Sequence, residues 1–414
     1  MMKLLKLKVN GYKLLEDDFE IDLTTKARVY NDETIKEVLS IDDSLNTLRS
    51  IAFVGGNSSG KSTVLTLLLK TLIFLQTGRW EYIEREFNNT KIHLDTVFFL
   101  NHSIYKYSVD FCKIDQTIIS NANKYCPIRN EKLFESKYKK TLGKKNLEIL
   151  DNDAVDKTQL LESSLEDTSA ITKLTKHEIF VDDFYTNNIT TFNEVIVRNT
   201  FFTSLSSCDK SLVSSIIQLL DDSIEYIIYK NSDNVVFKRF NENEINTNSA
   251  ELIAILSAGT FRGVELYIRA INALKLGKIF IVDEIENCFQ KNLVYNLLFL
   301  FNDEEINKNG AQIIFSTHYV EILDYLKRRD GIFITHKENG KINVKNLYSN
   351  YNVRAELLKS KQFDNNVFNT SLNYNQLLKV RRNIINELCS NNDWGINRAC
   401  ICQSFARKKY FKIW

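Results

Sequence analysis

The sequence of 414 residues is poor in proline, has no long apolar run and carries almost no net charge. Pro127 is the only proline, so proline content cannot mark linkers between domains. The longest apolar stretch, Val294–Phe301, is far shorter than the roughly 18 residues that a membrane span needs. The formal charge of +2 gives no general attraction to nucleic acid or anionic membranes, so any basic surface must be local.

The seven cysteines are odd in number and form no CxxC pair, which argues against a disulfide framework and a zinc site. Cys400 and Cys402 are expected to be two reduced thiols near the C-terminus. Lysines interrupt the apolar residues at the start of the chain, so it lacks the unbroken apolar core of a signal peptide. We therefore expect a cytoplasmic protein with no membrane partner.

The length of the chain allows two or three domains, and its hydrophobic periodicity predicts an α/β protein. Alternation over 4–10 and 19–23 indicates paired N-terminal strands, and 95–111 indicates a hairpin that turns at Asn101 and His102. Strand patterns recur over 225–240. From residue 256 onward the chain alternates helix, strand, helix and strand, which favours a largely parallel sheet. The predicted segments are a helix to 276, a strand over 278–284, a helix to 301 and a strand over 311–318.

Two segments have weaker patterns. Residues 121–176 are charged and polar with faint helical spacing, which fits an inserted helical lobe or a flexible excursion. Residues 351–384 read as polar turns that lead into an amphipathic helix. The stretch 406–414 mixes cations with aromatic residues, which is typical of phosphate-contacting segments and also of a solvated tail.

The segment GGNSSGKST at 55–63 matches G-x-x-x-x-G-K-[ST], with a predicted strand before it and a helix after it. Glycines let the backbone curl around a phosphate, Lys61 brings a positive charge to the terminal phosphates, and the Ser62 hydroxyl can bind Mg²⁺. The pattern therefore predicts ATP and Mg²⁺ as ligands. The predicted nucleotide-binding residues of this loop are Gly55, Asn57, Ser58, Ser59, Gly60, Lys61, Ser62 and Thr63.

Two later strands are predicted to end with catalytic side chains. Asp283 follows the apolar run 279–282 and is the expected partner of Mg²⁺, while Glu284 can orient or deprotonate the attacking water. His318 ends the next strand, about one helix and one strand further along. Because parallel strands end at the same edge of a sheet, His318 is expected near the γ-phosphate. Lys61, Glu284 and His318 are the predicted catalytic residues.

Four motifs in this order resemble the heads of ABC-type ATPases: GGNSSGKST, LSAGT at 256–260, IVDEIEN at 281–287 and FSTH at 315–318. The chain is most similar to the soluble bacterial group related to SMC, RecF and OLD proteins, over about 1–75 and 225–340. The resemblance implies that Ser257 and Gly259 bind the γ-phosphate of ATP held in a second subunit. It also implies a homodimer or higher oligomer that closes around ATP.

With this resemblance, the expected fold is an ABC-type P-loop NTPase head with a mixed, mainly parallel sheet, N-terminal antiparallel strands and an inserted helical lobe. The expected division is 1–120 and 225–345 for the two parts of the head, 121–224 for the inserted lobe and 346–414 for an accessory segment.

Two functions remain open at this point. Relatives of this size without a nuclease domain resemble sensor ATPases of anti-phage systems, which act with a separately encoded nuclease or toxin. The alternative is a DNA-repair or chromosome-maintenance ATPase resembling RecF that clamps DNA directly. The near-neutral charge and the lack of long heptad repeats argue against an SMC-like arm.

Overall fold

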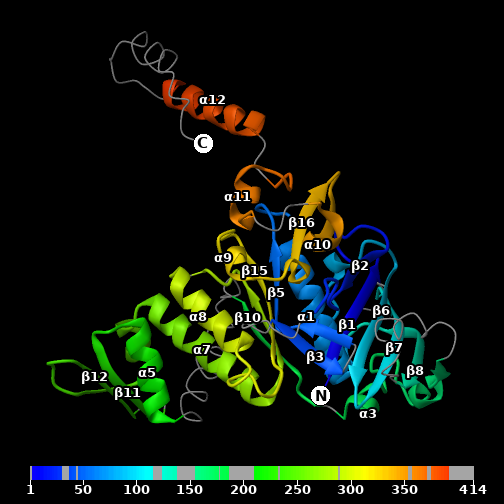
Figure 1. Ribbon diagram of the computed structural model, residues 1–414, viewed down its shortest axis with the longest axis horizontal. Helices are drawn as coiled ribbons and strands as arrows, with labels where there is room; N and C mark the ends of the chain where they lie inside the picture. Colours follow the sequence, from blue (N-terminus) through cyan, green and yellow to red (C-terminus); the bar gives the residue numbers. More distant parts are fainter. Residues whose placement is uncertain are drawn as a thin grey trace. The chain divides into compact units, whose positions relative to one another are not determined.

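The computed structural model describes residues 2–29, 37–42, 45–114, 124–137, 154–176, 178–185, 209–231, 234–287, 290–352, 357–370 and 374–390. Its backbone separates into two units, Met1–Phe368 and Asn369–Trp414, which are described in turn. Figure 1 shows the path of the chain. No helix among the described residues is long and apolar enough to cross a membrane.

An antiparallel sheet contains most of the N-terminal strands (Figure 1). Its alternating side chains bury one face, as the sequence pattern predicts. The predicted hairpin is confirmed, because Leu100 pairs with Ser103 across Asn101 and His102, both of which have positive φ. The strand order is β2 (Phe19–Asp22), β1 (Lys3–Asn10), β6 (Lys91–Leu100), β7 (Ser103–Cys112), β8 (Ile128–Lys137) and β9 (Val155–Asp156).

The second large sheet is mainly parallel, as expected from the alternation of helices and strands. Its strands are apolar and buried throughout their central part, because helices cover both faces. Only the edge strand β17 runs antiparallel to its neighbour. The order is β10 (Val181–Tyr185), β14 (Ile279–Asp283), β15 (Gln312–Thr317), β5 (Ser50–Val54), β16 (Ile332–Glu338) and β17 (Lys341–Asn346).

Helix α1 (Lys61–Thr77) lies between the two sheets, and its apolar residues on several sides belong to one core with both (Figure 1). Leu68 of α1 shares that core with Phe98 of the antiparallel sheet and Ile281 of the parallel sheet. Helices α7 (Ala258–Leu276) and α8 (Lys291–Asn302) pack on the other face of the parallel sheet. This sandwich fixes the start of α1 against the carboxyl ends of the parallel strands.

A smaller sheet packs on the outer side of α7. It is formed by β11 (Ile224–Asn231), β12 (Asn234–Arg239) and β13 (Ile245–Thr247), and it shares an apolar core with three helices. These helices are α5 (Lys210–Leu220), α6 (Ser249–Ile255) and the first half of α7. The strands predicted over 225–240 are therefore confirmed as a hairpin.

The described part of 121–224 contains strands as well as helices. β8 and β9 extend the antiparallel sheet, and β10 is an edge strand of the parallel sheet. The helices in this range are α3 (Thr172–Thr175) and α5. The helical lobe expected over 121–224 is therefore wrong for the described strands of this range, because they pair with the two large sheets instead of forming a separate helical unit. Residues 138–153 lie outside the described structure, so for them the expectation stays a prediction.

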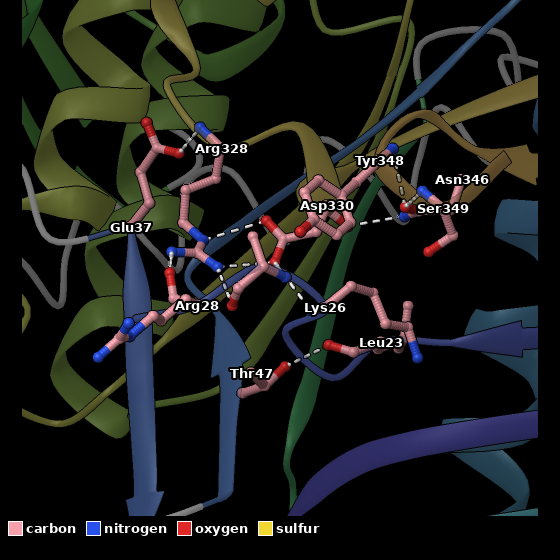
Figure 2. Close-up of polar contacts among 11 residues, drawn as sticks. Leu23, Lys26, Arg28, Glu37, Thr47, Arg328, Asp330, Asn346, Tyr348 and Ser349 are labelled. Atoms are coloured by element: carbon pink, nitrogen blue, oxygen red, sulfur yellow. Dashed lines mark hydrogen bonds and ion pairs between the residues drawn. The ribbon is translucent and has the colours of Figure 1, made fainter. Parts of the chain in front are cut away.

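A buried polar cluster joins the N-terminal segment to the start of β16 (Figure 2). The Arg328 guanidinium pairs with the Asp330 carboxylate at 2.7 Å, and that carboxylate also accepts the backbone N–H groups of Lys26 and Ala27. The Glu37 carboxylate accepts the backbone N–H of Arg328 at 2.8 Å. Since each charge has a partner, the cluster can be buried without orphaned charge and holds β16 in place.

Shorter elements complete the first unit: β3 (Val38–Asp42), β4 (Leu45–Leu48), α9 (Ile322–Tyr325), α10 (Leu347–Asn350), α11 (Lys359–Asp364) and the 3₁₀ turns η1 (Glu84–Glu86), η2 (Thr158–Leu161) and η3 (Arg329–Gly331). In the second unit, α12 (Tyr374–Ser390) is the amphipathic helix expected near the end of 351–384. Cys400, Cys402 and the stretch 406–414 lie outside the described residues.

Candidate active site

The loop between β5 and α1 lines a cavity of about 450 Å³ with residues 57–63. Ser58 and Gly60 have φ of 60° and 107°, so the backbone reverses twice before the helix begins. No side chain caps the N-terminus of α1, whose N-cap residue is Gly60. A helix start without a side-chain cap has backbone N–H donors to offer to an anion, which fits a phosphate.

Lys61 is only 5% exposed and points its ammonium back at its own loop. Nζ donates to the carbonyls of Gly55 at 2.9 Å and Gly56 at 3.1 Å. Burial lowers the pKa of Lys61 to about 8, although the carboxylates of Glu286, Glu284 and Asp283 oppose this shift. The loop thus concentrates positive charge in a largely dry position, where it acts strongly on a ligand.

Strands β16 and β17 support the loop from the side. The hydroxyls of Ser59 and Thr335 lie 2.6 Å apart, and a Cβ on Gly55 would come within 2.3 Å of the same Thr335 hydroxyl. A Cβ on Gly60 would come within 2.5 Å of Ile342. Both glycines are therefore required by close packing, and Gly60 also by its backbone conformation.

Asp283 ends β14 and is 4% exposed. The Ser316 hydroxyl from β15 donates to Asp283 Oδ1 at 2.6 Å and accepts the backbone N–H of Glu284 at 2.7 Å. Glu284 itself has a φ of 53°, which is uncommon for a residue with a Cβ. Ser316 thus fixes the turn that points Glu284 into the cavity rather than along the strand.

Glu284 and His318 face each other across the cavity, with His318 Nε2 lying 3.8 Å from Glu284 Oε1. Asn287 donates to the other carboxylate oxygen at 2.9 Å. His318 Nδ1 lies 3.4 Å from Lys61 Nζ. Because an ammonium can only donate, Nδ1 is the acceptor in this contact, and a neutral His318 carries its proton on Nε2 toward Glu284.

Glu286 is a site residue that the sequence reasoning missed. It is 8% exposed, and its Oε1 accepts the backbone N–H of His318 at 2.5 Å. Its Oε2 is buried without a hydrogen-bond partner among the described residues, and its charge acts on Lys61. The sequence signal for it is weak, because a third acid two residues after Glu284 reaches the strand ends only through the turn that the backbone makes at Glu284.

Ser257 and Gly259 do not line this cavity. Ser257 is the exposed N-cap of α7, and its hydroxyl accepts the backbone N–H of Thr260 at 3.0 Å. Gly259 lies in the first turn of the same helix. The structure therefore brings together residues 57–63, Glu284 and His318, and leaves the LSAGT segment outside this group. Gly55 is hydrogen-bonded to Lys61, and Asp283 is linked to the backbone of Glu284 through the Ser316 hydroxyl.

The donor set suits Mg²⁺ only together with a nucleotide. Within the described ranges, no group of three or more His, Cys, Asp or Glu side chains is arranged to hold a metal ion. Ser62 and Asp283 supply hard oxygen atoms at the edge of the site, and Mg²⁺ is commonly held by one or two such protein ligands plus phosphates and water. These residues fit that mode of binding.

The comparisons with known proteins cover most of this region. A family model described as "AAA domain, putative AbiEii toxin, Type IV TA system" matches residues 50–324. Among solved structures, the chain is similar to the SMC head domain from Thermotoga maritima, with 12% identity and a TM-score of 0.41. That comparison covers 83% of this chain and 98% of the other. No curated protein matches the chain.

Proposed function

Because the chain belongs to the AAA_21 family of AAA domains, we propose that it is an ATP-hydrolysing switch whose nucleotide sites are completed by a second copy of the chain. The observation that carries this proposal is the convergence of the Lys61 loop, Glu284 and His318 on one cavity. A phosphate-binding loop without a general base would support nucleotide binding alone. Here the Glu284 carboxylate and the His318 imidazole line the same cavity as the loop.

In this proposal the backbone of residues 57–63 and the Lys61 ammonium bind the β- and γ-phosphates of the substrate ATP. Glu284 accepts the proton of the attacking water, and Asn287 holds the carboxylate in place through the bond to its second oxygen. His318, oriented by Lys61 and by Glu286 on its backbone, holds its Nε2 proton beside Glu284, next to the position proposed for the γ-phosphate. Mg²⁺, held by Ser62 and Asp283, would neutralise phosphate charge.

The second copy would supply Ser257 and Gly259. Both lie outside the cavity of their own chain, at the exposed start of α7. A helix start offers N–H donors, and the Ser257 hydroxyl adds one more, so this end of α7 suits the γ-phosphate of a facing subunit. ATP would then hold two chains together, and hydrolysis would release them.

We further propose that the switch controls a separately encoded toxic effector in bacterial defence against phage. The words of the family description, which name a toxin and a type IV toxin–antitoxin system, support this partner class. The near-neutral charge also favours a protein partner over direct clamping of DNA.

The test is co-purification of the full chain with the product of its neighbouring gene, with and without ATP, using wild type and Glu284→Gln. We expect the amount of bound partner to change with ATP and the variant to hold the ATP-bound pattern. Retention of DNA with no dependence on the neighbour would instead support the RecF-like alternative. Absence of ATP hydrolysis by the wild-type chain would overturn the enzymatic part.

A further inference from the structure

A second cavity, of about 740 Å³, lies at the opposite end of α1 from the Lys61 loop. The last two turns of α1 line it with Lys70, Ile73 and Gln76, and the chain that follows adds Arg79 and Trp80. Gln76 is 15 residues beyond Lys61, which places the two cavities about 22 Å apart along the helix. They share no lining residue.

Cations dominate the charge of this cavity. Arg79 and Lys124 both lie against Tyr125, with the guanidinium carbon 5.1 Å and the ammonium nitrogen 5.8 Å from the ring centroid. The Arg79 Nε donates to the Thr168 hydroxyl at 3.0 Å, but neither cation has an ion-pair partner within the described part of the chain. Glu81 is the acid that lines the cavity. Two cations gathered on one ring favour an anion beside them.

The lining also includes buried polar atoms without partners. Trp80 is 1% exposed, and its indole Nε1 has no hydrogen-bond partner among the residues described. The same holds for Gln76 Oε1. A buried donor and a buried acceptor left unpaired carry a desolvation cost that a ligand with a matching polar edge would remove. Lys70, in contrast, is already paired with the Glu86 carboxylate.

Apolar and aromatic side chains complete the lining. Ile73 is 37% exposed and Ile179 is 63% exposed at the cavity, so both present aliphatic surface to a ligand. Tyr125 and the Arg79 guanidinium are planar groups of the kind that stack on heteroaromatic rings. The cavity volume lies in the range that holds small organic ligands.

We propose that this cavity binds a mononucleotide, separately from the ATP of the Lys61 loop. The phosphate matches Arg79 and Lys124, the faces of the base match the aliphatic and planar side chains, and the polar edge of the base matches Gln76 and Trp80. An inorganic anion would leave the donor and acceptor unpaired, and an uncharged ring would leave the cations uncompensated.

The test measures mononucleotide binding by calorimetry to the full chain in two preparations: wild type saturated with ATPγS, and Lys61→Ala. The probes are AMP, GMP, CMP, UMP and inorganic phosphate. We expect one mononucleotide to bind per chain in both preparations. Arg79→Ala with Lys124→Ala should weaken it at least tenfold, whereas Lys132→Ala with Lys210→Ala removes the same charge from exposed positions elsewhere and should leave it unchanged.

Gln76→Leu distinguishes recognition of the base from recognition of the phosphate. It should weaken mononucleotide binding severalfold and leave phosphate binding as it is. The proposal is overturned if no mononucleotide binds in either preparation, or if phosphate binds as tightly as the nucleotides. Binding of a 5′-phosphorylated oligonucleotide without any binding of free mononucleotide would also overturn it. Failure of wild type to bind ATPγS would count against the ATPase proposal alone, because Lys61→Ala tests the cavity without it.

Discussion

In our proposal, the N-terminal ends of α1 and α7 both contact phosphate. They differ in how much of the phosphate site a single chain supplies at each. At α1, the start of the helix lacks a side-chain cap and meets Glu284 and His318 in a cavity. At α7, the start of the helix is capped by its own Ser257 and borders no part of that cavity. The start of α1 thus faces a cavity of its own subunit, whereas the start of α7 is exposed and is hydrogen-bonded by its own N-cap side chain.

This difference explains why an ATPase of this design would need two copies. In our proposal the Lys61 loop holds phosphates by itself, whereas the start of α7 contacts a γ-phosphate only across an interface between two chains. The Ser257 hydroxyl, which now accepts from Thr260, can also donate, so its capping bond does not prevent a phosphate contact. Substitutions in the Lys61 cavity and at the start of α7 should therefore have different effects on ATP binding and hydrolysis.

The largest effect on the rate of hydrolysis is expected for Glu284→Gln, in the part of the site that a single chain supplies. Loss of a general base slows a reaction by about 100- to 10,000-fold, while the Lys61 loop should keep its ATP. Gel filtration with ATP should then show a larger species than wild type forms. The exposed Glu305→Gln is the matched control; a Glu284→Gln chain that hydrolyses ATP normally would point to another base.

Lys61→Ala should remove phosphate binding itself. Loss of one preorganised donor to a developing charge costs about 100- to 1,000-fold in rate, and here the ground-state contact is lost as well. Calorimetry with ATPγS should show greatly weakened binding, in contrast to Glu284→Gln. Normal affinity and turnover in this variant would contradict the placement of ATP in the loop, with Lys132→Ala as the control for charge.

Ser257→Arg should block hydrolysis and keep the first ATP contact, because its bulk and charge would clash with the facing loop. Mixed with Lys61→Ala protein, it should regain activity, since a mixed dimer has one intact composite site. Random pairing of equal amounts gives up to about a quarter of wild-type activity if single sites work alone. Turnover of each variant alone and of the mixture is the measurement.

Ser257→Ala removes the cap and the proposed phosphate contact without adding bulk. Loss of the cap costs about 0.5–2 kcal/mol of stability, and turnover should fall less than in Ser257→Arg, because nothing clashes with the facing loop. If Ser257→Arg is folded, binds ATP and is fully active by itself, then the α7 start does not face a phosphate. That result would remove the contrast between the two helix starts.

The core of the ATPase could be predicted from sequence because each of its strands and helices has a local pattern. The apolar run 279–282, the glycines of 55–60 and the hairpin turn at Asn101 and His102 each indicate one conformation, and the structure has them. The roles of the site residues remain predictions. Their gathering at one edge follows from parallel strands that end together.

Long-range contacts could not be predicted in this way. Edge strand β10 is only five residues long and carries two adjacent aspartates, and it joins the parallel sheet by pairing with β14, which no local pattern reveals. Thr335 supports the loop at Ser59 from 276 positions away. Glu286 stood within a recognised motif, yet its contact with the backbone of His318 depends on a turn after Glu284 that periodicity does not encode.

The smallest expected effect concerns how α7 is anchored at its other end. Lys3 of β1 donates to the carbonyl of Gly310 at 2.6 Å and lies 3.5 Å from that of Gly277, the C-cap of α7. Burial, and secondly the charge of Arg49, lower the pKa of Lys3 to about 7. In the unfolded chain this group keeps its proton to about pH 10, so above pH 7 the unfolded state binds more protons and stability rises with pH.

Urea denaturation should therefore show a free energy of unfolding about 1 kcal/mol higher at pH 8 than at pH 7 from Lys3 alone. Lys3→Met should remove this increment, while Lys6→Met, on the same strand but half-exposed, should keep it. Because Lys3 contacts the carboxyl end of α7, the increment reports on the anchoring of the helix that carries Ser257. An equal increment in Lys3→Met would mean that another group titrates, and that the N-terminal sheet holds α7 by packing alone.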